Sequence, residues 1–119
     1  MNKYKCIEII NKYLSQYLWM DFELCRLDGG EFILFGYLDE MENDKIKIIF
    51  KEPYMISCVL FFSYEGKGNF ITLVEGDEFV RLNTMYKVTK DNFIFKIKAE
   101  GIDKNMIVIA KEIDCEIIE

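Results

Sequence analysis

The sequence predicts an α+β fold: one N-terminal amphipathic helix packed on a strongly twisted antiparallel sheet of about seven or eight strands, open or partly closed into a barrel. Within residues 3–19, apolar side chains recur at helical spacing. From residue 22 onward, short runs rich in Ile, Val, Phe and Tyr end at Gly, Asn or Asp, as consecutive strands do. Because the 119 residues are 51% hydrophobic and 15% aromatic, we expect a single domain over 1–119.

The helix predicted over residues 3–19 has one apolar and one polar face. Spacings of three and four residues bring together the apolar face, which comprises Cys6, Ile10, Tyr13, Leu14, Tyr17 and Leu18. We expect this to be the only long helix and to cover one face of the sheet.

An antiparallel β meander is predicted over residues 22–118, and its first half contains four strands: 22–27, 31–38, 45–50 and 54–64. Gly29 and Gly30 suit the positive φ values of a tight hairpin. Pro53 cannot donate a ladder hydrogen bond, so we expect it in the break before the fourth strand. Residues 32–38 and 54–62 are apolar in both side-chain registers, which predicts central strands that are covered on both faces.

The second half of the meander contains four more strand patterns: 70–74, 84–89, 93–99 and 106–118. The strands at 84–89 and 93–99 should pair as a hairpin, and residues 79–82 fit a strand or a helical turn equally well. In the last strand, Lys111 interrupts the apolar row of alternate residues and indicates a bulge or an exposed bend. The side chains expected to be almost inaccessible to solvent are Ile10, Leu14, Leu34, Ile48, Leu60, Phe62, Phe95 and Ile109.

Charge and composition exclude several classes of function. Fifteen Lys and Arg face 21 Asp and Glu, a formal net charge of −6, and the basic residues form no patch that would bind nucleic acid. The chain contains no histidine, so neither a Ser-His-Asp triad nor a two-histidine metal site can form. We therefore expect no catalytic residues, no cofactor and no metal.

The four cysteines and the lack of a visible targeting signal indicate the cellular compartment of the protein. Cys6, Cys25, Cys58 and Cys115 lie far apart within apolar runs, which favours four reduced thiols over a disulfide or a metal site built from all four. No signal peptide is visible, and the longest apolar run, 55–62, is too short to span a membrane. Abundant Ile, Lys and Asn with only two Arg indicate an AT-rich bacterial genome, so we expect a soluble protein of a bacterial cytoplasm.

Nine residues are candidates for binding a partner. Two loops supply carboxylates, and the junction of helix and sheet supplies aromatic side chains typical of interfaces. The candidates are Asp39, Glu40, Glu42, Asp44, Glu75, Asp77, Glu78, Tyr17 and Trp19. The first loop lacks the glycine and the final glutamate of an EF-hand, so calcium binding is not expected. Packing of the helix end on the sheet is the alternative role of the two aromatic residues.

These observations favour a non-enzymatic binding module with a protein partner of basic character. In size and acidity, and in its lack of catalytic apparatus, the chain is similar to bacterial immunity and antitoxin proteins, which neutralise basic toxin domains by charge and shape. One alternative is a carrier of small apolar ligands with aromatic residues lining a β cavity, and a weaker one is a hydrolase that uses loop carboxylates. A filled core with a clustered acidic surface would favour the binding module.

Overall fold

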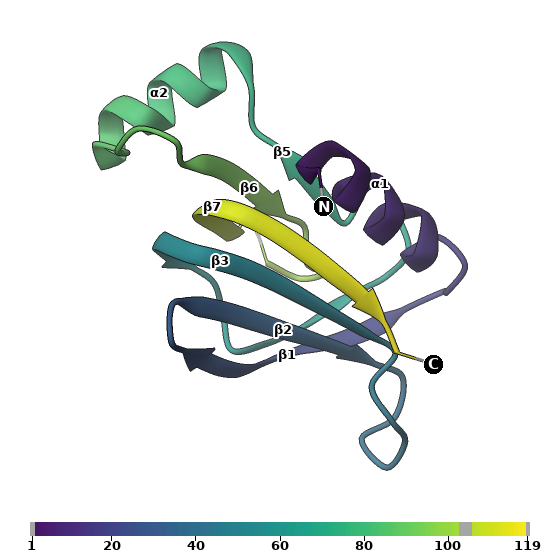
Figure 1. Cartoon of the computed structure of the whole chain (residues 1–119). Coiled ribbons are helices and arrows are strands. Elements are labelled where there is room, and N and C mark those ends of the chain that lie inside the picture. The colour runs from purple at the N-terminus through teal and green to yellow at the C-terminus, as the bar shows by residue number, and fades with distance from the viewer. Residues whose placement is uncertain (1, 103–105, 119) are drawn as a thin grey trace.

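A computed structural model describes residues 2–102 and 106–118, without the side chains of residues 25–28. Seven antiparallel strands form one sheet in the order β4-β1-β2-β3-β7-β6-β5, and the sheet curls into a half-barrel (Figure 1). This confirms the predicted α+β class with a twisted antiparallel sheet. The elements are α1 (Lys3–Leu14), β1 (Met20–Asp28), β2 (Glu31–Tyr37), β3 (Ile46–Ser57), β4 (Phe61–Tyr64), β5 (Ile71–Leu73), α2 (Gly76–Tyr86), β6 (Phe93–Ile97) and β7 (Met106–Ile117).

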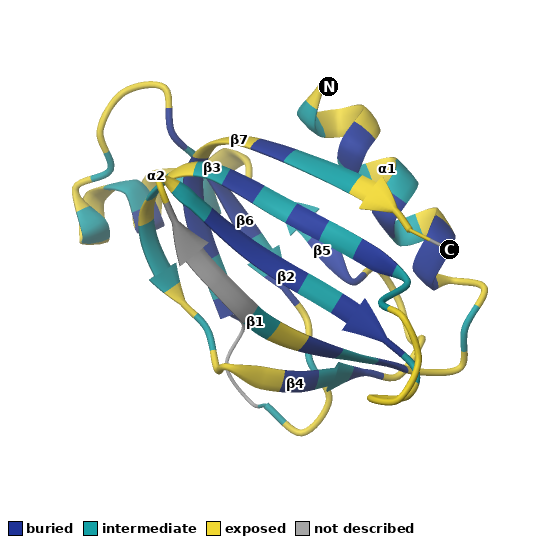
Figure 2. Ribbon diagram, turned by 60° about the horizontal axis from the view of Figure 1, so that its bottom comes forward, coloured by how far each residue is buried: buried dark blue, intermediate teal, exposed yellow. Residues whose placement is uncertain are grey.

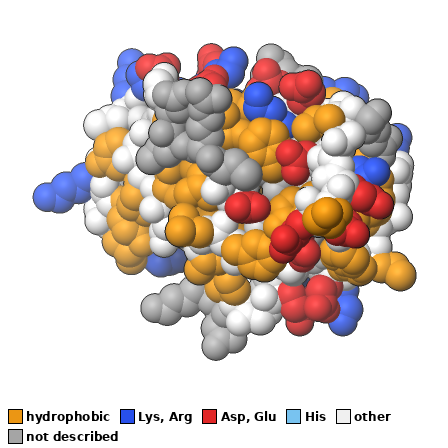
Figure 3. Space-filling view, turned by 90° about the horizontal axis from the view of Figure 1, so that it is seen from below, with side chains coloured by type: hydrophobic (Ala, Val, Ile, Leu, Met, Phe, Trp, Pro, Cys, Tyr) orange, Lys and Arg blue, Asp and Glu red, His pale blue; other side chains and the backbone are white. Residues whose placement is uncertain are grey.

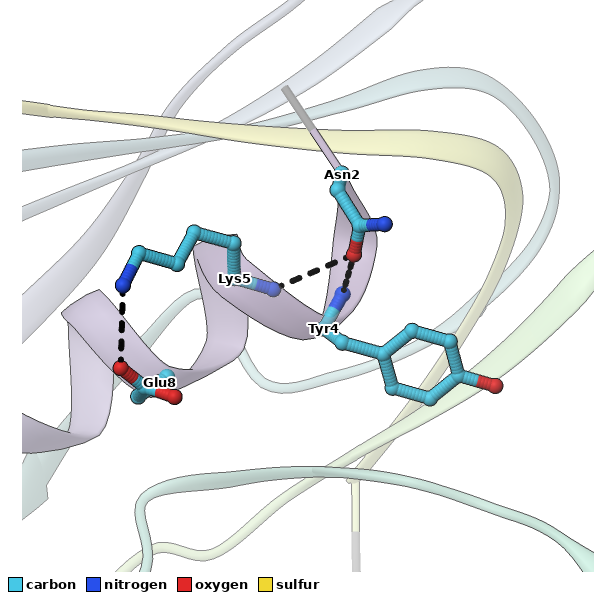
Figure 4. Close-up of polar contacts among 4 residues, drawn as sticks. All are labelled: Asn2, Tyr4, Lys5 and Glu8. Atoms are coloured by element: carbon cyan, nitrogen blue, oxygen red, sulfur yellow. Dashed lines mark hydrogen bonds and ion pairs between the residues drawn. The ribbon is translucent and has the colours of Figure 1, made fainter.

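Helix α1 begins at a side-chain cap. The Asn2 Oδ1 atom accepts hydrogen bonds from the backbone N–H groups of Tyr4 and Lys5, at 2.8 and 3.3 Å (Figure 4). This cap satisfies two donors that have no partner within the helix. One turn further, Lys5 Nζ lies 3.2 Å from Glu8 Oε1 on the exposed side of the helix.

The prediction that this helix extends to residue 19 is wrong, because α1 ends at Leu14. The N–H groups of Gln16 and Tyr17 bond to carbonyl oxygens three residues back, at Tyr13 and Leu14. Such bonds tighten the last turn of a helix, and the chain then leaves it towards β1.

The main core lies between α1 and the inner face of the curled sheet. Figure 2 shows buried and less buried residues alternating along the first half of β3, as expected when one face of a strand points inward, whereas β2 is buried at most of its positions. Aromatic rings fill the interior: Phe22 stacks on Phe70 with ring centroids 4.4 Å apart, and on Phe62 at 5.6 Å. Gly36 makes room for them, since a Cβ atom there would come within 2.8 Å of Phe22 and Ile46.

The strand predicted over 84–89 is wrong, because residues 76–86 form the second helix, α2. Residues 79–82, which fitted a strand or a helical turn, lie within it. Helix α2 packs Leu82 on Ile94 and Ile109, whose neighbours in β6 and β7 point into the main core. Because successive strand residues face opposite sides, α2 covers the outer face of the sheet at this end. Strand β6 pairs with β5 and β7, not with 84–89.

Pro53 also departs from the prediction, because β3 continues through it. The pairing of β2 with β3 stops at Lys51, so beyond this residue β3 has a strand partner on one side only. The register with β7 shifts between Pro53 and Met55, and Glu52 adopts a positive φ of 50°. A proline is tolerated where the ladder is interrupted and one edge is free.

Seven of the eight core predictions are confirmed and Leu60 is wrong. Strand β3 ends at Ser57, so 54–62 is not one central strand as expected, whereas β2 is central. Leu60 lies in the connection before the edge strand β4 and is 67% exposed, although its carbonyl oxygen accepts a bond from the Leu24 N–H. Phe61 points outward and the next residue, Phe62, points into the core.

In β7, the residues that point into the main core change from even-numbered to odd-numbered positions around Lys111. The bulge or bend predicted there implies such a change. Lys111 and Glu112 are both exposed, and Ala110 and Ile113 on either side of them are both in the main core. An odd spacing between two inward residues requires an irregular strand. Ile109 consequently belongs to the outer cluster under α2 and not to the same row as Ile113.

The two edges of the sheet are partly protected. At the β5 edge, the Asn11 side chain of α1 bonds to both backbone polar groups of Ile71, with Nδ2 donating to the carbonyl at 2.8 Å and Oδ1 accepting from the N–H at 3.0 Å. At the β4 edge, the Glu100 N–H donates to the Ser63 carbonyl at 2.8 Å. The segment after β6 thus reaches β4 and narrows the opening of the half-barrel.

Candidate partner-binding surface

Polar side chains of β1 face away from the core and lie beside aromatic residues of β2 and β4. Asp21 pairs with Tyr37 on one side and with Ser63 on the other. Glu23 likewise pairs with Phe35 and with Phe61. Directly opposed residues in a sheet point to the same face, so these side chains form one outer surface.

This outer surface lies outside the areas that the two helices cover. Helix α1 packs on β7 and β5, and the cluster under α2 draws on β3, β6 and β7. Seen from below, the molecule exposes a broad group of hydrophobic side chains with Asp and Glu side chains among them (Figure 3). On this face, Glu23 of β1 and Phe61 of β4 are exposed, whereas the outward side chains of Ile33 and Tyr37 in β2 are almost fully buried.

A recess of about 290 Å³ lies on this surface, where the β2–β3 loop folds beside β1 and β4. Its lining combines four carboxylates with two aromatic rings: Glu23, Glu40, Glu42, Asp44, Tyr37 and Phe61. We call these six residues the acidic recess. No lysine or arginine is among the described side chains that line it.

The β2–β3 loop has a defined turn that presents its carboxylates. Asp39 forms the turn, because its Oδ1 accepts a hydrogen bond from the Met41 N–H at 2.9 Å and its carbonyl accepts one from the Glu42 N–H at 3.0 Å. The Lys45 N–H donates to the Gly36 carbonyl at 2.7 Å and returns the chain to the sheet. Asp39 is thus a turn-forming residue, and Glu40, Glu42 and Asp44 are the residues the loop contributes to the recess.

The carboxylates perturb the titrating groups around them. Tyr37 is only 6% exposed, and its hydroxyl lies 3.4 Å from Glu23 Oε2. Burial, with the charges of Glu23, Asp21 and Glu40, raises the pKa of Tyr37 to about 12, so its hydroxyl stays protonated. Burial and then the charge of Glu23 raise the pKa of Asp44 above its ordinary value. Negative charge is therefore crowded here.

The other three predicted acids lie at the opposite end of the molecule, at the start of α2 (Figures 1 and 2). Asp77 and Glu78 occupy the first helical turn, where the helix dipole favours negative charge. Glu78 also bonds to Lys96 Nζ at 2.7 Å. The charge of Glu75, together with a hydrogen bond to it, raises the pKa of Tyr4. The structure does not bring this group together with the β2–β3 loop.

The two aromatic candidates differ in exposure. Tyr17 is half-buried against the main core, and its hydroxyl lies 3.1 Å from that of Tyr13. Trp19 is 44% exposed, next to the almost fully exposed Leu18. Trp19 immediately precedes β1, and the pairing of Asp21 with Tyr37 places the start of β1 beside the end of β2, from which the acidic loop departs.

Sequence reasoning missed Glu23, Tyr37 and Phe61 as site residues. The alternation of apolar and acidic residues over 20–24 does indicate that Asp21 and Glu23 face away from the core. The pattern does not indicate which strands lie on either side of β1. That pairing, with β2 and β4, is what places two aromatic rings beside the carboxylates.

Metal ligands, membrane-spanning helices and cysteines are the remaining features that bear on function. Among residues 2–102 and 106–118, no three acidic or cysteine side chains are grouped so that they could hold a metal ion. None of the described helices is long and apolar enough to cross a membrane. Cys6, Cys58 and Cys115 are free thiols, and the Cys25 side chain lies outside those described. No protein family, curated protein or solved structure shows detectable similarity to the chain.

Proposed function

We propose that the protein is a non-enzymatic binding module of a bacterial cytoplasm, immunity- or antitoxin-like in character, and that a basic protein docks on the acidic recess. The observation that carries this proposal is the recess itself: four carboxylates around Tyr37 and Phe61, on a sheet face that neither helix covers.

The lining of the recess fits an arginine or lysine side chain of the partner. A guanidinium group can bond to two carboxylates and stack on an aromatic ring at the same time. Glu23 and Phe61 are direct neighbours across β1 and β4 and offer both contacts. A buried carboxylate without a partner is costly, so a protein covering this recess has to supply positive charge.

Exposed apolar side chains beside the recess provide the rest of an interface. The run Val59, Leu60 and Phe61 is exposed at 43, 67 and 54%. Apolar and aromatic residues of this kind act as anchors when a partner excludes water from them. Their burial would contribute affinity, and the carboxylates would contribute orientation and speed of association.

The carrier and hydrolase alternatives receive less support. The rings that a carrier would use to line a cavity stack on one another in the main core, for example Phe22 on Phe70. A hydrolase needs two carboxylates held at a fixed separation with divergent pKa values. In the β2–β3 loop, the described side-chain hydrogen bond is that of Asp39, and it serves the turn.

The test compares two triple variants of equal charge. Glu23→Gln/Glu40→Gln/Glu42→Gln removes carboxylates of the recess, and Glu8→Gln/Glu65→Gln/Glu100→Gln removes exposed carboxylates elsewhere. Each changes the formal charge from −6 to −3, because three acids are neutralised. A partner is first captured with the wild-type chain from the source cell, and association and dissociation rates are then measured at several salt concentrations.

We expect the recess variant to lower the association rate by about tenfold or more at low salt, and the control variant by less than about threefold. The wild-type association rate should fall steeply with salt, since the Debye length is only about 10 Å at 0.1 M. Equal losses of association rate in both variants would assign the effect to net charge and refute docking of the partner on the acidic recess. Native mass spectrometry showing a stoichiometric apolar ligand and no protein partner would favour a carrier.

A further inference from the structure

Two thiols from opposite ends of the chain meet between α1 and β7. Cys6 is in the second turn of α1 and is fully buried in the main core. Cys115 is near the end of β7, packs against the same core and is half-buried. Helix α1 packs directly on β7, and Lys3, one turn before Cys6, lines a recess together with Ile113 and Asp114, which immediately precede Cys115.

We propose that Cys6 and Cys115 form a redox-responsive pair, in which a peroxide oxidises the sulfur of Cys115 and Cys6 then resolves it to a disulfide that ties α1 to β7. The pair lies on the inner side of the sheet, against the main core, whereas the acidic recess lies on the outer face of β1, β2 and β4. The inference therefore does not depend on the proposed function.

The two sulfurs are unequal, and the inequality sets the order of events. The interaction between the two thiols lowers the pKa of Cys115 and, with burial, raises the pKa of Cys6. A thiol with a lowered pKa forms more of the thiolate that reacts with oxidants, which favours Cys115 as the sulfur that is oxidised first. Exposure agrees with this order, because solvent reaches Cys115 and does not reach Cys6.

Each step balances with a peroxide as the oxidant. The Cys115 thiolate attacks one peroxide oxygen, the O–O bond breaks, and the products are a sulfenic acid and, after protonation of the leaving oxygen, water. The sulfur of Cys6 then attacks the sulfur of Cys115, forming the S–S bond and breaking the S–O bond. The departing hydroxide takes the Cys6 proton as a second water. Two thiols lose two electrons, and hydrogen peroxide is reduced to two waters.

The link would join nearly the two ends of the chain, since it closes a loop from residue 6 to residue 115. A loop of roughly this length strongly restricts the unfolded chain. We therefore expect oxidation to raise the thermal unfolding midpoint by roughly 10 °C or more, and reduction to reverse the change. Helix α1 would then be fixed to the sheet in oxidised protein and held by packing alone in reduced protein.

Cys58 provides a matched control. It is also half-buried, but its sulfur contacts the Val59 carbonyl at 3.1 Å and the Met106 sulfur at 3.4 Å. Burial raises the pKa of Cys58 to about 11, so it remains a thiol at neutral pH. Exposure comparable to that of Cys115 without a lowered pKa should leave Cys58 unreactive.

The experiment uses the full chain, purified with reductant, freed of it and treated with hydrogen peroxide. Thiol titration after unfolding should fall from four to two, and peptide mapping should find residues 6 and 115 linked. Cys58→Ser should leave the link intact. Cys6→Ala should trap Cys115 as a sulfenic acid that dimedone labels, and Cys115→Ser should leave Cys6 unmodified. Circular dichroism confirms that each variant is folded.

The wild-type peptide map decides the matter even if a variant does not fold. A disulfide that includes Cys25 or Cys58 would overturn the proposal, as would four free thiols after exposure to excess peroxide. Peroxide products confined to methionine would also overturn it. An intact Cys6–Cys115 link with an unchanged unfolding midpoint would refute the restriction of α1.

Discussion

The contact between α1 and the edge of β5 offers the sharpest test of how the helix holds the sheet. The Asn11 side-chain amide takes the place of a neighbouring strand at the free edge of β5. It donates to the Ile71 carbonyl and accepts from the Ile71 N–H. Ile71 is fully buried and lies in a strand of only three residues at the end of the sheet. Asn11→Ala removes both partners while keeping the helix intact.

The expected loss follows from two hydrogen bonds of 2.8 and 3.0 Å in a partly buried place. Each contributes about 1 kcal/mol net, and an N–H or C=O left unsatisfied costs about 1–3 kcal/mol. Alanine regains roughly 0.5 kcal/mol as a better helix former than asparagine. We therefore expect Asn11→Ala to lower the free energy of unfolding by about 1.5–3 kcal/mol.

Urea denaturation followed by circular dichroism measures this loss, and hydrogen exchange locates it. Lys12→Ala is the control: Lys12 is the next residue of α1 and is exposed, so its effect should stay within about 0.5 kcal/mol. The Ile71 amide should exchange faster in Asn11→Ala than in either the wild type or the control. A loss below about 0.5 kcal/mol, or unchanged exchange at Ile71, would refute the assigned role.

Two further substitutions test the core and the recess. Leu34→Ala should lower the free energy of unfolding by about 2–5 kcal/mol and Leu60→Ala by less than about 0.5 kcal/mol, measured by urea denaturation; similar values would mean that Leu60 is buried. Asp44→Asn should raise the thermal unfolding midpoint at pH 7, because the raised pKa of Asp44 means that its ionisation opposes folding. The gain should vanish as the pH falls below about 4, where Asp44 is itself neutral, and a gain that persists there would contradict this cause.

Much of the fold could be predicted because local patterns and tertiary structure agree. The helical spacing of α1 and the alternation along the first half of β3 both match the faces that are buried. The wrong predictions arose where the local sequence pattern and the tertiary structure disagree. Thr84, Tyr86 and Val88 favour a strand by residue type, but α2 forms because Leu82 and its neighbours bury a helical face on β6 and β7.

The predictions for Pro53 and Leu60 were wrong for a different reason, since both depend on where the strands begin and end. Proline is acceptable in β3 because β2 begins at Glu31, opposite Lys51, and so does not pair with Pro53, which no local pattern reveals. Leu60 continues the apolar run of 54–62, but the chain leaves the sheet after Ser57 and rejoins it at Phe61. The acidic recess is subject to the same limit: its loop was predicted, and the pairing that adds Glu23 and Phe61 was not visible.

The two groups of predicted carboxylates are chemically alike and differ in what surrounds them. At the start of α2, the helix dipole and Lys96 compensate the negative charge, so Asp77 and Glu78 contribute to stability. In the recess, Asp44 is partly buried beside Glu23, which weakens the fold. Residues that cost stability persist where a function requires them. Asp44→Asn should accordingly stabilise the isolated protein and slow its association with a basic partner, whereas an Asp44 charge without a role in binding would leave the association rate unchanged.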